Sequence, residues 1–288
     1  MSQHVNLPDG RIEYEDRGSG RPVVCVHGYL MGGDLWDEVA ERLAGRGHRV
    51  LTPTWPLGAH RHALADDADR TPLGQAKRIA DFLDALDLRD VILLGNDTGG
   101  ALAQLVAAYH PERLGALVLT NCDVFENFPP SFFKLLRPLA RSRRAFAGLA
   151  VALRSGAIRR SSAGYGLLSH AGVDDRAVGW VRPIRENVGV REDTRLFTRA
   201  LRSQALLDAE PAMRRFDRPA LIVWGTDDRL FPVRDAERLV AMFPNARLEL
   251  VAQSRTYVMV DQPDRLAELV ASPALTATSL PAQGPGMP

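Results

Sequence analysis

The sequence has few cysteines, no long apolar run and almost no net charge. Two of its 288 residues are cysteine, which excludes a disulfide framework in a chain of this length. Cys25 and Cys122 lie in apolar stretches, a pattern that predicts buried free thiols and a reducing compartment. No run reaches the roughly 18 apolar residues of a membrane span, and the first residues lack the apolar core of a secretion signal. We therefore expect a cytoplasmic protein with no membrane anchor.

Charges are balanced over the chain as a whole but are unevenly distributed along it. Lysine and arginine number 36, aspartate and glutamate 35, and the formal net charge is +1, so a general attraction to nucleic acid is not expected. Arginines concentrate within residues 134–202. This excess is typical of a solvated helical surface, and the alternative is a site for an anionic substrate. The hydrophobic content of 45% suffices for a large core.

Residues 91–109 predict a strand, a tight turn and a helix. Residues 91–94 are apolar, and 101–109 contain strong helix formers. The turn between them reads Gly-Asn-Asp-Thr-Gly, the Gly-X-nucleophile-X-Gly pattern in which a sharp turn lifts the central residue, here Asp97, above a sheet. The positive end of the helix favours the ionised form of this carboxyl. Aspartate is also a common helix N-cap, so the turn alone leaves both interpretations open.

Alternating strand and helix patterns on either side of this turn predict the fold class. An opening hairpin is expected around Pro8-Asp9-Gly10. The further expected strands are 22–26, 49–55, 114–121, 220–225 and 247–251, and the expected helices are 34–43, 72–86, 233–243 and 263–270. Such β-α repeats form an α/β protein with a mostly parallel central sheet flanked by helices.

Residues 122–207 interrupt this alternation. They contain helix-like pieces, such as 131–153 and 195–207, and no convincing strand. We expect a helical cap inserted over the carboxyl end of the sheet, where open α/β sheets bind ligands. The core would then comprise residues 1–121 and 208–270, and the composition of 271–288 predicts a disordered tail.

Three motifs in this order resemble the α/β-hydrolase fold superfamily, and within it the haloalkane dehalogenase and epoxide hydrolase branch. His27-Gly28 follows a strand, as the family's oxyanion segment does, and Asp97 occupies the nucleophile position. In the segment GTDDRLFP, Asp228 has the spacing of the family's triad acid. The resemblance extends over residues 5–270 and supports the interpretation of Asp97 as a nucleophile rather than a cap.

The resemblance also implies roles for backbone groups and a class of substrate. The N–H groups of Tyr29 and Thr98 would form the oxyanion hole. Enzymes of this kind act on small organic molecules without a cofactor or a metal, and we expect a monomer or homodimer. Thr98 stands where such dehalogenases commonly carry a halide-binding tryptophan, and the cap offers one tyrosine, Tyr165, where the epoxide hydrolases use two.

The segment after the last expected strand departs from the family pattern. Thr256 occupies the position of the family's catalytic histidine, and no histidine follows His170. An ionised carboxylate can displace a leaving group or open an epoxide, but it is a poor attacker of ester and amide carbonyls. Release of the resulting alkyl-enzyme requires water activated by a base, which Thr256 cannot be at neutral pH.

Three functions therefore remain open. An atypical hydrolase would take its base from elsewhere, and His60 and His62 are the candidates because they follow a strand that ends at the same edge of the sheet. The alternative for both is a solvated loop position. A non-hydrolytic lyase, isomerase or cyclase would use Asp97 to move protons. A catalytically silent relative would bind a small molecule under the cap.

Overall fold

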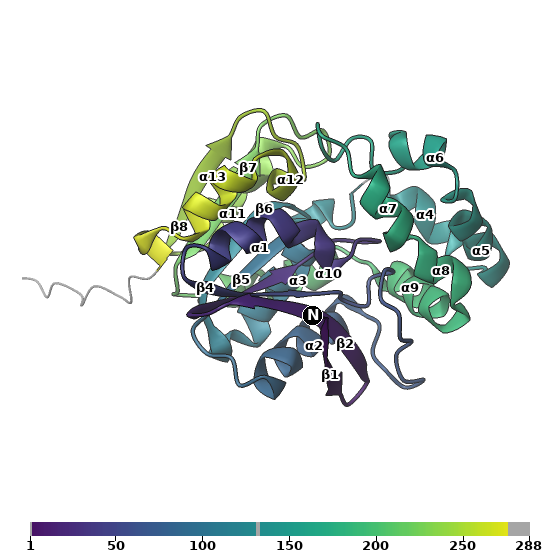
Figure 1. Cartoon of the computed structure of the whole chain (residues 1–288), viewed down its shortest axis with the longest axis horizontal. Coiled ribbons are helices and arrows are strands. Elements are labelled where there is room, and N and C mark those ends of the chain that lie inside the picture. Colours follow the sequence, from purple (N-terminus) through teal and green to yellow (C-terminus); the bar gives the residue numbers. More distant parts are fainter. Residues whose placement is uncertain (1, 131–132, 276–288) are drawn as a thin grey trace, which may run out of the picture.

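An eight-stranded sheet forms the centre of the protein (Figure 1). The computed structural model describes residues 2–130 and 133–275. The strand order is β1-β2-β4-β3-β5-β6-β7-β8, in which β2 runs antiparallel to both of its neighbours and β3 to β8 are parallel. The strands are β1 (Gln3–Leu7), β2 (Gly10–Gly18), β3 (Arg21–Val26), β4 (His48–Pro53), β5 (Val91–Asp97), β6 (Leu114–Cys122), β7 (Ala220–Gly225) and β8 (Ala246–Val251). The predicted fold class is confirmed.

Helices cover both faces of this sheet (Figure 1). On one face α1 (Asp37–Ala44) packs against α13 (Pro263–Val270), and on the other α3 (Thr98–Tyr109) packs against α2 (Pro72–Ala85) and α10 (Gln204–Met213). The helix α11 (Val233–Met242) contacts β7 and β8, and the short α12 (Val258–Asp261) precedes α13. Because both faces are covered, β5 is buried along its whole length, which explains its continuous apolar run.

The described chain between β6 and β7 is helical, without a strand. Six of its helices lie beside the sheet, at the right of Figure 1, and we call them the cap helices. They are α4 (Phe133–Leu139), α5 (Arg143–Ala152), α6 (Gly156–Arg160), α7 (Asp174–Trp180), α8 (Arg182–Glu186) and α9 (Val188–Ala200). The piece expected at 131–153 is broken, because the Ser142 side chain caps a new helix by accepting from the N–H of Ala145. The expected boundary at 207 falls inside α10, which packs on α3.

The prediction for the C-terminal tail is partly wrong, and the prediction for the two cysteines is confirmed. The tail prediction is wrong for residues 271–275, since Leu275 is buried and its carbonyl oxygen accepts from Nη1 of Arg21 at 2.6 Å. Residues 276–288 lie outside the described part. Cys25 and Cys122 are buried and free, as predicted. Among the described residues no helix has the length and apolar character needed to cross a bilayer.

Candidate active site

Asp97 lies where β5 passes into α3. Its backbone angles, φ 54° and ψ −134°, are rarely adopted by a residue other than glycine and indicate local strain. Two positions later, a Cβ at Gly99 would collide with the carbonyl oxygen of Val26, so glycine lets the start of α3 approach β3. A strained strand-to-helix turn is the geometry in which a side chain is held above the sheet.

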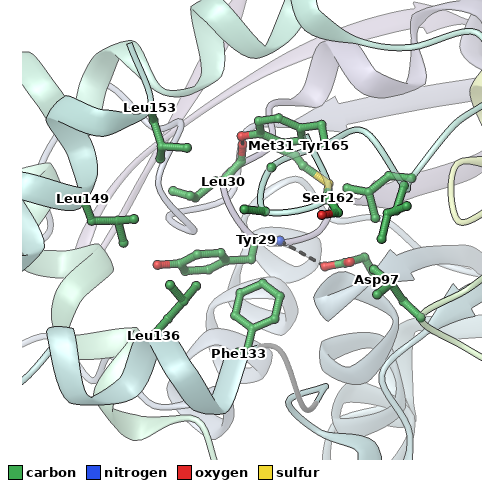
Figure 2. A pocket seen from close by; sticks show the side chains of 15 residues that line it. Tyr29, Leu30, Met31, Asp97, Phe133, Leu136, Leu149, Leu153, Ser162 and Tyr165 are labelled. Atoms are coloured by element: carbon green, nitrogen blue, oxygen red, sulfur yellow. Dashed lines mark hydrogen bonds between the residues drawn. The ribbon is translucent and has the colours of Figure 1, made fainter. Parts of the chain in front are cut away.

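Backbone N–H groups surround one oxygen of the Asp97 carboxylate. Oδ1 accepts from the N–H of Thr98 at 2.6 Å and from the N–H of Tyr29 at 3.3 Å, the latter drawn in Figure 2. The absence of a side chain at Gly28 permits this contact, because a Cβ there would collide with the carboxylate. No described residue makes a hydrogen bond to Oδ2. One oxygen is thus fixed, and the other is left to a ligand.

Burial controls the protonation of Asp97. The side chain is 4% exposed, and loss of solvation raises the pKa of Asp97 to about 6, although the N–H groups of Thr98 and Tyr29 act in the opposite direction. The nearby charge of Asp228 raises the pKa further. Burial therefore has a larger effect on the pKa of Asp97 than the N–H groups at the start of α3, contrary to the expectation from the sequence. The carboxyl is still mainly ionised at neutral pH.

Asp228 lies in the loop that follows β7, where backbone and amide donors orient it. Its Oδ1 accepts from the N–H groups of Leu230 at 2.7 Å and Phe231 at 3.1 Å, and its Oδ2 accepts from Nδ2 of Asn121 at 2.8 Å. Partial burial raises the pKa of Asp228, while these donors and the adjacent Thr256 side chain lower it. The carboxylate is held in one orientation, with no cationic partner among the described residues.

Thr256 is fully buried between β8 and α12. Its carbonyl oxygen accepts from Nδ2 of Asn96 at 2.8 Å, and the same Nδ2 donates to the carbonyl oxygen of Asn121 at 3.0 Å. The Thr256 hydroxyl lies close enough to Asp228 to lower the pKa of that carboxyl, yet none of the described residues, Asp228 included, meets it at hydrogen-bond geometry. The structure thus brings Asp97, Asp228 and Thr256 to the same end of the sheet.

His60 and His62 are bound elsewhere. Nε2 of His60 lies 3.3 Å from Oδ2 of Asp193 in α9, and burial lowers the pKa of the His60 ring. Nε2 of His62 lies 3.2 Å from Oε1 of Glu13 at the surface. Neither ring lines the cavity around Asp97, and none of the chain's other histidines does. The geometry therefore does not support a substitute base from this loop.

Two side chains from the region between β6 and β7 contact the segment that contains Tyr29. The Thr198 hydroxyl of α9 donates to the carbonyl oxygen of Thr194, so the Tyr29 hydroxyl, 2.7 Å away, donates to Thr198. The hydroxyl of Tyr165 donates to the carbonyl oxygen of Leu30 at 2.7 Å. These two contacts thus hold the side chain of Tyr29 and the carbonyl group of Leu30, the residue that follows it.

A largely apolar cavity of about 310 Å³ opens above Asp97 (Figure 2). Its floor is formed by Asp97 and the Tyr29 segment, and its walls by leucines of α4 and α5 and by residues 162–168. Ser162, at the rim, and Tyr165 contribute hydroxyl groups, and none of the described lining side chains is positively charged. No group of three or more His, Cys, Asp or Glu side chains in the described chain is arranged to hold a metal ion.

Sequence reasoning missed two buried groups near Asp97. Asp123 directly follows β6, and its Oδ2 accepts from the Thr98 hydroxyl at 3.0 Å. Burial and the charge of Asp97 raise the pKa of Asp123 well above its usual value. Tyr257 is fully buried, and no residue in the described part of the chain makes a hydrogen bond to its hydroxyl. The sequence could have indicated Asp123, because this residue follows the strand next to β5 and so lies at the edge of the sheet where ligands bind.

Comparison with known proteins places this geometry in a family. A profile described as alpha/beta hydrolase fold matches residues 21–263. The chain is 26% identical over 284 residues to 2-hydroxy-6-oxononadienedioate/2-hydroxy-6-oxononatrienedioate hydrolase 1 of Dechloromonas aromatica, with 93% of each chain covered. It is 28% identical to a non-heme chloroperoxidase of Kitasatospora aureofaciens, with 83% of this chain and 86% of the relative covered. A crystal structure of an alpha/beta hydrolase fold protein from Burkholderia ambifaria superposes with a TM-score of 0.78 at 25% identity, with 93% and 96% covered. This chain belongs to the alpha/beta hydrolase fold family.

Proposed function

We propose that this protein is an enzyme in which Asp97 attacks a small, uncharged and largely apolar organic molecule. The state of the carboxylate is the observation that carries the proposal: Oδ1 accepts two N–H bonds, and Oδ2 is free at the floor of an apolar cavity. An ionised carboxylate so placed opens an epoxide or displaces a leaving group at saturated carbon, and an alkyl-enzyme ester forms. The reaction is that of an atypical, epoxide-hydrolase-like hydrolase with Asp97 as nucleophile.

The cavity lining supports an uncharged substrate. The relative from Dechloromonas aromatica is named for substrates with two carboxylates, and a buried carboxylate needs a cationic or hydrogen-bonding partner. No described side chain in this cavity provides a positive charge. The buried cap arginines Arg159 and Arg195 pair instead with Asp174 and Glu192. We therefore infer that the arginine-rich cap does not select an anionic substrate.

A hydroxyl group at the cavity favours an epoxide over an alkyl halide. Ser162 lines the cavity with a hydroxyl that can donate a proton to an oxygen leaving group, whereas the Tyr165 hydroxyl already donates to the carbonyl oxygen of Leu30. A departing halide would not find a tryptophan N–H to bind it here, because Thr98 stands where dehalogenases of this branch commonly carry that tryptophan. When water later attacks the ester, Oδ1 becomes the oxyanion, and the N–H groups of Thr98 and Tyr29 are already directed at it.

A second candidate follows from the pKa of Asp97. A general base works best when its pKa lies near the operating pH, and the value of about 6 is much closer to neutrality than that of an ordinary aspartate. The cavity also contains no imidazole among its described lining residues. Both features favour a lyase, isomerase or cyclase in which Asp97 shuttles a proton and no ester forms.

Isotope labelling separates the two candidates. The wild-type enzyme is incubated with neutral aryl and alkyl epoxides in H2¹⁸O and, in a parallel experiment, in D2O. Asp97 is examined by peptide mass spectrometry after several turnovers in H2¹⁸O, and the product is examined for deuterium after turnover in D2O. Nucleophilic attack places ¹⁸O in the Asp97 carboxylate, because the water that cleaves the ester leaves its oxygen there. Turnover without ¹⁸O in Asp97, combined with solvent deuterium in the product, would support the proton-shuttle function. Tight binding unchanged by Asp97→Asn, without turnover, would show a binding protein.

A further inference from the structure

The Thr256 hydroxyl is a buried polar group without a partner. It is fully inaccessible, and no described group accepts its proton or donates to it. Leaving a buried hydroxyl unsatisfied destabilises the folded state, so such groups usually bind an ordered water. This hydroxyl occupies the position of the imidazole in the family pattern, and what it binds therefore concerns the step that the imidazole would catalyse.

A network of asparagines places this hydroxyl relative to the two carboxylates. Asn96, the residue before Asp97, donates through Nδ2 to the carbonyl oxygens of Thr256 and Asn121. Asn121 in turn donates to Oδ2 of Asp228 at 2.8 Å. The backbone of Thr256 is thereby tied to the end of β5, and its side chain lies beside Asp228. A water at the Thr256 hydroxyl would therefore also contact Asp228, and two or more polar partners are what a buried water requires.

We propose that Thr256 and Asp228 together hold the water that releases product from Asp97, and that Asp228 itself removes the proton of this water. The inference rests on the proposed nucleophilic function. Thr256 orients the water, and Asp228 takes over the role of general base, which a histidine has in the family pattern. Asp123 is the alternative base, since its Oδ2 accepts from the Thr98 hydroxyl and its Oδ1 has no partner among the described residues. Neither Asp123 nor Asp228 is among the residues that line the cavity, and we choose Asp228 because the Thr256 side chain lies beside it.

Asp228, the oxyanion donors and one water molecule account for the bonds that form and break in the release step. Asp228 takes a proton from the water as the water oxygen bonds to Cγ of the Asp97 ester, and Oδ1 becomes an oxyanion held by Tyr29 and Thr98. The oxyanion collapses, and the bond between Cγ and the alkyl oxygen breaks. Asp228 returns its proton to the departing alkoxide, which leaves as an alcohol. Asp97 is left as a carboxylic acid with one oxygen derived from water, and it returns to the carboxylate when its remaining proton passes to solvent.

The charges of the two carboxylates favour Asp97 as the attacking group and Asp228 as the base. Before attack, Asp97 and Asp228 are two carboxylates close enough to influence each other's ionisation. Esterification removes the charge of Asp97, so Asp228 then acts without a like charge beside it. Partial burial already raises the pKa of Asp228, which makes it a stronger base than a solvated aspartate.

Four variants of the full-length chain test the proposal with styrene oxide as the probe. Intact-mass analysis of quenched samples follows the alkylated enzyme, and its growth and decay give the rates of attack and release. We expect Thr256→Val, which keeps the shape and removes the hydroxyl, to slow release about 10- to 100-fold while the rate of attack changes less than about threefold. Thr256→Ser keeps a hydroxyl and should release within about threefold of the wild-type rate.

Asp228→Asn should slow release about 100-fold or more, and Asp227→Asn, at the exposed neighbouring residue, should behave as wild type. Thermal unfolding of each variant shows whether it is folded. Release by Thr256→Val at the wild-type rate, or a wild-type adduct that never decays, would overturn this inference and leave Asp97 as the nucleophile. No adduct in the wild type or any variant, and no ¹⁸O in Asp97, would instead refute the proposed function itself.

Discussion

The two halves of the candidate site differ in completeness. Around Asp97 the strained turn, both backbone donors and the glycines that admit them match the pattern expected for an attacking carboxylate. Around Asp228 backbone and amide donors orient the carboxylate, and the side chain beside it is Thr256 rather than a histidine. In the proposed mechanism different strands supply attack and release, so mutation should affect the two steps separately.

The strongest way to break this comparison is to remove the attacking group. Asp97→Asn should reduce turnover by a factor on the order of 10⁴, since the amide is a poor nucleophile and a poor base. Steady-state product formation measures the loss, with Asp227→Asn as the matched control. Residual turnover within tenfold of wild type would remove Asp97 from the chemistry altogether.

A histidine introduced beside Asp228 should speed release and leave attack unchanged. Thr256→His places an imidazole beside Asp228, and we expect it to accelerate decay of the alkyl-enzyme about 10- to 100-fold. The rate of attack should stay nearly constant because the Asp97 donors do not involve this side chain. The variant is compared with Thr256→Gln, which is similarly long and cannot act as a base. Equal decay rates in the two variants would contradict the expectation.

The pH profile tests the attacking half without mutation. Attack requires the ionised carboxylate, and the pKa of Asp97 is about 6. The rate of adduct formation should therefore rise as the pH increases through about 6, become constant above about 7 and fall about tenfold by pH 5. A rate still constant down to pH 4.5 would mean that burial does not raise this pKa.

The same shift affects stability with a defined sign. The folded state keeps the Asp97 proton up to about pH 6, whereas the unfolded chain loses it near pH 3.8, so folding becomes less favourable as the pH rises between these values. Asp97→Asn removes this penalty. It should raise the free energy of unfolding at pH 8 by up to about 3 kcal/mol, and by less at pH 5. Urea unfolding at both pH values measures the difference.

A smaller effect is expected where the cap holds the oxyanion segment. Tyr29→Phe and Thr198→Val each remove one hydroxyl from the same hydrogen bond. Either change should lower kcat about threefold to tenfold, as the N–H of Tyr29 becomes less well positioned. The double variant should lose no more than either single one, since the bond is already broken. Tyr109→Phe, at an exposed position, provides the control.

The smallest effect is expected at the histidine loop. His62→Gln should leave both attack and release unchanged, because His62 contacts Glu13 at the surface. His60→Gln should lower the free energy of unfolding by about 1–3 kcal/mol through the loss of the Asp193 contact, while folded enzyme keeps its turnover. A release rate that falls tenfold in either variant would restore the substitute-base hypothesis and weaken the assignment to Asp228.

Much of the fold was predictable from periodicity and turn residues. Strand 220–225 and helix 263–270 were predicted with the bounds observed for β7 and α13. The cap was predicted as helical, but its individual helices were not. Short helices such as α6 depend on contacts with the remainder of the cap rather than on a local pattern. Leu275 was assigned to a tail, because the contact that orders it comes from Arg21 at the other end of the chain.

The sequence by itself determined the order of strands and helices, the turn that presents Asp97 and the absence of any histidine after residue 170. Only the tertiary structure decided which groups surround that carboxylate. The contacts of Asn96 with Thr256, of Asn121 with Asp228 and of Tyr165 with Leu30 join residues more than 100 positions apart. Local propensity carries no information about such pairs, because they form only when the sheet brings the ends of its strands together.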